Sequence, residues 1–182
     1  PPLTIPEMLE DIDKVVKWAS RVGAYTNEST GLHMNVSVPG QKNLDFVKLV
    51  MFLGDNYILE QFGREGNNYC KSQLNALQKT AREHPDRVDE MLRQFQGGLN
   101  QLASKVIHTG STGKYSSINV QSNRVEFRSP GGDWITQYGK DPSLIKNTLL
   151  RGVVALDVAT KPEAFKNEYY KKLYKTLSQG TE

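Results

Sequence analysis

Residues 115–128, with the sequence YSSINVQSNRVEFR, decide the fold of this chain. Two stretches within this segment, 115–120 and 124–128, alternate between apolar and polar residues and flank a tight turn at residues 121–123. Alternation with a period of two is typical of strands, and two such stretches joined by a short polar turn predict a β-hairpin. We therefore expect antiparallel pairing at the centre of the fold.

The sequence on either side of this hairpin predicts one more strand and several helices. The strand covers residues 32–38, where apolar residues alternate with His33, Asn35 and Ser37. Apolar residues at helical spacing predict helices over residues 4–22, 44–62, 69–82, 86–106, 142–159 and 165–177. This order favours antiparallel or mixed pairing over a parallel βαβ sheet. The expected fold class is α+β, an antiparallel sheet backed by several helices, in one domain over residues 1–182 with an amphipathic helix within residues 160–182.

Composition excludes several classes of protein. The 182 residues are 37% hydrophobic, and no apolar run approaches the roughly 20 residues of a membrane-spanning helix. A single cysteine, Cys70, excludes an internal disulfide and makes a cysteine-based zinc site untenable. The net charge is only +3, and the most basic stretch, residues 161–175, also carries Glu163 and Glu168. This pattern disfavours nucleic-acid binding. We expect a cytoplasmic protein that has no contact with membranes.

The second hairpin strand carries the strongest candidate for chemistry. Its alternation places Arg124, Glu126 and Arg128 on one face of the sheet. One interpretation is an exposed ladder of ion pairs. The other is a site for a metal-bound polyphosphate, in which Glu126 binds a divalent cation and the two arginines neutralise phosphoryl oxygens.

Other candidate sites are weaker. His33 and Asn35 share the polar face of their strand. A phosphate loop ending at Lys114 is rejected, because His108 stands where a glycine is required and Tyr115 where serine or threonine is required. Cys70 is expected to be a buried free thiol, and no local nucleophile signature surrounds it.

Several motifs occur together in an order that resembles the amidoligase family, whose relatives are glutamine synthetase and glutamate–cysteine ligase. These motifs extend up to Arg128, and the sequence beyond it resembles only a generic helical tail. They are Thr30-Gly31-Leu32-His33, Arg64 followed by Tyr69-Cys70, Lys114-Tyr115 with Asn119, and Arg124-Val125-Glu126-Phe127-Arg128.

This resemblance implies a glutamine synthetase-like catalytic fold and ATP-dependent formation of an amide from a carboxylate and an amine, each of them a small molecule or a peptide. It further implies that Mg²⁺ or Mn²⁺ is bound by His33 and Glu126. Residues expected to bind the ATP cofactor are Arg124, Asn35, Tyr115 and Asn119. Residues expected to act in catalysis are Arg128, which would stabilise the transferring phosphoryl group, Lys114 and Arg64.

One feature of the family is missing from this sequence. The family has an upstream Glu-x-Glu strand that supplies further metal ligands, whereas the early acidic residues here, Glu7, Glu10, Asp11 and Asp13, fall on the first predicted helix. The chain therefore resembles the C-terminal part of an amidoligase. We expect an open or unusually paired sheet edge, completed by an upstream segment or a partner chain, and no ATPase or ligase activity from residues 1–182 alone. The alternative is a non-catalytic binding or structural module that retains the ligase fold.

Overall fold

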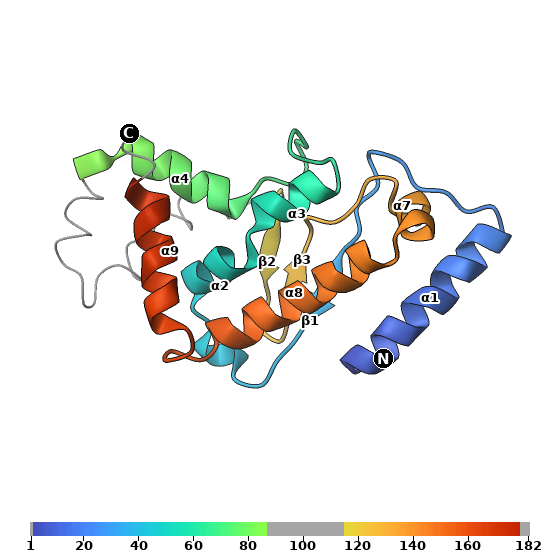
Figure 1. Ribbon diagram of the computed structural model, residues 1–182, viewed down its shortest axis with the longest axis horizontal. Helices are drawn as coiled ribbons and strands as arrows, with labels where there is room; N and C mark the ends of the chain where they lie inside the picture. Colours follow the sequence, from blue (N-terminus) through green and yellow to red (C-terminus); the bar gives the residue numbers. More distant parts are fainter. Residues whose placement is uncertain (1, 87–114, 179–182) are drawn as a thin grey trace.

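The structure is a computed structural model, and it describes residues 2–86 and 115–178 (Figure 1). It has the predicted α+β class, with a small antiparallel sheet among helices. The elements, in chain order, are α1 (Ile5–Arg21), β1 (Met34–Val36), the 3₁₀ helix η1 (Gln41–Asn43), α2 (Phe46–Leu53), α3 (Asp55–Gln61), α4 (Gln73–Glu83), β2 (Ile118–Val120), β3 (Val125–Phe127), α7 (Trp134–Lys140), α8 (Ser143–Ala159) and α9 (Lys166–Ser178).

The predicted hairpin forms the middle of the sheet. The strand order is β1-β3-β2, and β3 pairs antiparallel with both neighbours. Because strand side chains alternate between the two faces, one face of this sheet is apolar and the other polar. The apolar face enters the core through buried residues of all three strands, namely Met34, Val36, Ile118, Val125 and Phe127.

Helix α8 packs closely on the apolar face of the sheet, and Figure 1 shows it crossing in front of the strands, with α2 beside them. A Cβ atom added at Gly152 would lie only 2.9 Å from the ring of Phe127. The glycine therefore permits the close approach between helix and sheet. The polar face points away from this packing, so the helices leave it available as a candidate site.

Most predicted helices are present, with differences at their ends. Helix α1 begins directly after Thr4, where Glu7 and Thr4 form a capping box. The single helix predicted over residues 44–62 is wrong, because Gly54 adopts a left-handed conformation with φ of 61° and separates α2 from α3. Helix α7 was not predicted at all. The helix predicted over residues 86–106 lies almost wholly outside the described residues.

A buried carboxylate connects three elements beside the core. Asp55 is fully buried at the start of α3 and accepts hydrogen bonds from the backbone N–H groups of Gln73 and Leu74, at 2.5 Å and 3.2 Å. These two N–H groups belong to the first turn of α4, so Asp55 caps a neighbouring helix. It also accepts from the hydroxyl groups of Ser72 and Ser117. Asp55 thus ties α3 and α4 to the segment that leads into β2.

None of the helices in the described parts of the chain is long and apolar enough to cross a membrane. The predicted C-terminal amphipathic helix is present as α9, which buries Tyr169, Leu173 and Leu177.

Candidate functional site

The candidate site is the polar face of the three-stranded sheet. Asn35 of β1 and Asn119 of β2 both lie opposite Glu126 of β3 in the strand register. Directly opposed residues share a face, and so do residues two apart in one strand. The register therefore gathers the sequence-predicted residues of three segments on one face: His33, Asn35, Asn119, Arg124, Glu126 and Arg128.

Glu126 is the centre of this arrangement. Its Oε1 atom lies 2.8 Å from Nδ1 of His33. Its Oε2 atom accepts hydrogen bonds from Arg128, at 2.7 Å from Nη2 and 2.9 Å from Nε, and from Nδ2 of Asn119 at 3.0 Å. The two residues expected to bind metal, His33 and Glu126, thus come into direct contact, whereas their roles as metal ligands stay predictions.

The electrostatics of the site favour an ionised carboxylate. Burial by itself would raise the pKa of Glu126, whose side chain is only 12% exposed. Hydrogen bonds from Asn119 and Arg128, together with the electrostatic effects of Arg128 and His33, outweigh burial and hold the pKa below its usual range. Glu126 is therefore negatively charged at neutral pH, as a cation ligand must be.

His33 and Glu126 fit one side of a metal site. The side chain of His33 is half exposed, and the 2.8 Å between Nδ1 and Oε1 would let both atoms reach one ion at bond lengths of roughly 2.0–2.6 Å. Within residues 2–86 and 115–178, however, no group of three or more His, Cys, Asp or Glu residues is placed to hold a metal. Two protein ligands are few for a divalent cation, so further ligands would have to come from elsewhere.

A cavity adjoins the Arg124 end of the polar face. Nε of Arg124 donates to Oδ1 of Asn35 at 3.0 Å, and both residues line a cavity of about 380 Å³. Its other walls come from the start of α1, from the β2–β3 turn and from α8, and include Leu3, Met8, Asn123 and Leu149. The structure thus brings Arg124 and Asn35, both of which the sequence predicts to bind ATP, to a recess with apolar and polar walls.

Arg64 does not lie on the open face but beneath the end of β3. It is buried, and its Nη1 atom donates to the carbonyl oxygens of Arg128, Ser129 and Pro130, at 3.0, 3.1 and 2.5 Å. A guanidinium held in this way fixes the backbone that follows β3. These contacts give Arg64 a positioning role, and its predicted role in catalysis stays a prediction.

The remaining predicted residues have different placements. Tyr115 is exposed and forms an edge-on ring contact with Tyr69, with the ring centroids 5.7 Å apart. Lys114 lies outside the described residues. Cys70 is buried, its Sγ donates to the carbonyl oxygen of Arg128 at 3.2 Å, and burial raises the pKa of the thiol to about 11. Such a thiol stays protonated at neutral pH, which fits the expected free, inert cysteine.

The predicted open edge can be examined in the described strands. Glu126 lies on the central strand, and the outer edge of β1 has no strand partner among the described residues. At the start of β2, Lys71 forms an isolated parallel bridge with Ser116, with backbone hydrogen bonds of 2.7 and 3.0 Å. Because no described strand pairs with the outer edge of β1, the backbone groups of this edge could pair with another strand.

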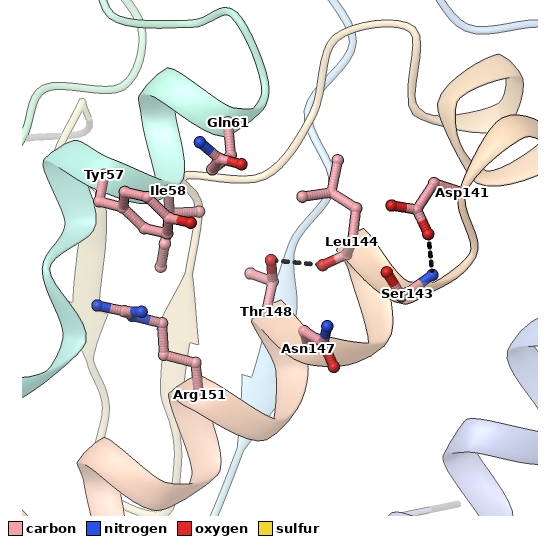
Figure 2. Close-up of a pocket in the computed structure, with 9 residues that line it drawn as sticks. All are labelled: Tyr57, Ile58, Gln61, Asp141, Ser143, Leu144, Asn147, Thr148 and Arg151. Carbon is pink, nitrogen blue, oxygen red and sulfur yellow. Dashed lines mark hydrogen bonds between the residues drawn. The ribbon is translucent and has the colours of Figure 1, made fainter.

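A second cavity, not expected from the sequence, lies between α3 and α8 (Figure 2). It has a volume of about 240 Å³, and the guanidinium group of Arg151 lies over the Tyr57 ring, 5.0 Å from the ring centroid. Nε of Arg151 donates to the carbonyl oxygen of Leu53 at 2.5 Å. Figure 2 shows Asp141 at the other end of the groove, where it accepts from the backbone N–H of Ser143. None of the sequence-predicted site residues lines this cavity.

Comparisons of the chain with family models, with curated proteins and with solved structures find no match. The resemblance to amidoligases therefore rests on the motifs themselves.

Proposed function

We propose that this chain carries part of the active site of an ATP-dependent carboxylate–amine ligase. In the proposed reaction, a carboxylate oxygen of one substrate attacks the γ-phosphorus of ATP, which gives an acyl phosphate and ADP. The amine of the second substrate then attacks the acyl carbon, so that an amide forms and phosphate leaves. The observation that carries this proposal is the contact between His33 and Glu126 on a polar sheet face that also carries Arg124 and Arg128.

Five residues of this face have a chemical role in the proposal. His33 and Glu126 would hold Mg²⁺ or Mn²⁺, which when bound would neutralise charge on the phosphates. Arg128 would donate hydrogen bonds to the transferring phosphoryl group, and Arg124 would contact the nucleotide phosphates. Asn35, which accepts a hydrogen bond from Arg124, would orient this arginine toward the adjoining cavity.

The proposal includes a requirement for groups outside the described residues. A phosphoryl-transfer site has to neutralise a triphosphate, and two protein ligands are too few for this. An upstream segment or a partner chain that pairs with the open edge of β1 would bring further carboxylates. Residues 1–182 alone are therefore expected to bind a divalent cation weakly and to have no ATPase or amide-forming activity.

The proposal is tested by Mn²⁺ titration of residues 1–182, followed by electron paramagnetic resonance of the free ion. We expect one weak site, which His33→Ala and Glu126→Gln each abolish. His84→Ala is the matched control, since His84 caps the C-terminal end of α4 and should leave binding intact. Binding that survives both site substitutions would contradict the proposal. Robust hydroxamate formation by the isolated chain would show instead that the catalytic carboxylates lie within it.

A non-catalytic module is the second candidate, and one observation favours it. Both carboxylate oxygens of Glu126 already have protein partners, in His33, Asn119 and Arg128. These hydrogen bonds and ion pairs around Glu126 would stabilise the polar face without a bound metal ion. If this candidate is correct, Mn²⁺ does not bind at His33 and Glu126, although Glu126→Gln still lowers the stability of the fold.

A further inference from the structure

Helix α1 has an apolar stripe that the rest of the described structure leaves largely exposed, although Met8 at its start also borders the cavity beside Arg124. Val16 and Ala19 face inward and are buried. In contrast, Met8, Val15, Trp18 and Val22 are 36%, 54%, 58% and 58% exposed. Positions 8, 15 and 22 are seven residues apart and position 18 lies between the last two, so these side chains form one line along the helix.

The arrangement of the stripe distinguishes it from scattered surface residues. Single exposed apolar residues are normal, but a continuous stripe that includes a tryptophan is typical of an interaction surface. Figure 1 shows α1 at one side of the molecule, where it packs against α7. An ion pair of 2.7 Å between Asp13 and Lys146 of α8 also attaches it to the domain. The helix is thus fixed on one side and open on the other.

The charges beside the stripe indicate what covers it. The first half of α1 is acidic, with Glu7, Glu10 and Asp11. The second half is basic, with Lys14, Lys17 and Arg21. Two such helices in parallel would place like charges side by side. An antiparallel pair would place the acidic half of each against the basic half of the other, which is the favourable arrangement.

We propose that α1 pairs antiparallel with α1 of a second copy of this chain, around a two-fold axis near Val15. A two-fold interface uses the same patch on both subunits, so the patch has to be complementary to itself. The charge pattern of α1 meets this requirement, since reversing the helix exchanges acid and base. The apolar stripes of the two copies form the centre of the contact, with the two Trp18 rings as the main anchors.

Sedimentation equilibrium of the full chain tests the proposal. We expect a monomer–dimer equilibrium, and Trp18→Ala should raise the dissociation constant by about 30-fold or more, as for an aromatic anchor. Tyr174→Ala is the matched control, because Tyr174 on α9 is 53% exposed but lies outside the stripe; it should leave the equilibrium unchanged. A chain that stays monomeric at about 0.2 mM overturns the proposal, as does a dimer that Trp18→Ala leaves intact.

Charge reversal tests the antiparallel orientation. Arg21→Glu would bring a carboxylate beside Glu7 of the second copy at both ends of the pair, and should weaken the dimer roughly tenfold. A further Glu7→Gln change removes this repulsion and should restore part of the affinity, while glutamine keeps the capping geometry with Thr4. In a parallel pair position 21 faces position 21 of the second copy, so Arg21→Glu would only exchange one like-charge pair for another; an affinity that Arg21→Glu leaves unchanged therefore overturns the antiparallel arrangement. Far-ultraviolet circular dichroism checks that α1 remains folded in each variant.

Discussion

Replacement of Glu126 by glutamine should reveal how much the polar face contributes to the stability of the fold. The carboxylate accepts two hydrogen bonds from the Arg128 guanidinium, at 2.7 Å and 2.9 Å, and one from Asn119 at 3.0 Å. The side chains of Glu126 and Arg128 are only 12% and 20% exposed. Solvent therefore screens this ion pair weakly, and the loss of the negative charge should be costly.

The size of the effect follows from this burial. Hydrogen bonds to charged groups contribute about 1.5–3 kcal/mol, and removal of one partner of a largely buried pair costs more than removal of an exposed one. The contact with His33 adds little, because the His33 side chain is half exposed. We expect Glu126→Gln to lower the free energy of unfolding by about 2–3 kcal/mol. With a slope of about 2 kcal/mol per molar urea, the unfolding midpoint should fall by about 1 M.

The pH dependence gives this prediction a second measurement. The pKa of Glu126 in the folded chain is below its usual range, so its contribution to stability is present above the unfolded value of about 4.3 and is lost as pH falls through the folded value. The difference between wild type and Glu126→Gln should therefore be full at roughly pH 7 and should shrink progressively as the pH falls below about 4.3. The reasoning would be refuted if Glu126→Gln cost no more than Glu10→Gln, which removes an exposed ion pair with Lys14.

Three further predictions concern residues beneath the site. Gly152→Ala should destabilise the fold by about 1–2 kcal/mol in urea unfolding, because its Cβ would meet the Phe127 ring, whereas Gly139→Ala in α7 has open space and should be neutral or stabilising. Asp55→Ala should cost about 3 kcal/mol or more, since it leaves donors at the start of α4 and in the segment before β2 unsatisfied; a loss below about 1 kcal/mol would contradict its linking role. Cys70 should react with a thiol reagent much more slowly in the folded chain than in urea, and equal rates would contradict its burial and the pKa of about 11.

Local patterns in the sequence were sufficient to predict the strands that carry the site. The hairpin followed from its alternation and its turn, and the structure places β2 and β3 as an antiparallel pair. The meeting of His33 with Glu126 was also predictable, because both residues lie on the polar faces of alternating strands. The strand order was not predictable from these patterns. It is the register that sets Asn35 and Asn119 on opposite sides of Glu126.

Features that depend on distant contacts were missed. Residues 44–62 have helical periodicity throughout, and a glycine within such a pattern is compatible with an uninterrupted helix. Only in the fold does Gly54 become left-handed, which lets Asp55 turn inward and cap α4. Likewise, nothing in the residues around Arg64 indicates that its guanidinium is buried against carbonyl groups some 64 to 66 positions later in the chain.

The placement of Arg64 explains how an open polar face keeps a defined geometry. The backbone after β3 passes so close to Arg64 that a Cβ atom at Gly131 would lie 2.6 Å from its Nη1 atom and 2.5 Å from the carbonyl oxygen of Thr30. Arg64 also holds the carbonyl of Arg128 from the buried side, while Glu126 holds the Arg128 side chain on the polar side. The backbone and the guanidinium of Arg128 are thus fixed from opposite directions. The proposed role of Arg128 toward a transferring phosphoryl group would require such positioning, because electrostatic stabilisation depends on donors that are oriented before the charge develops.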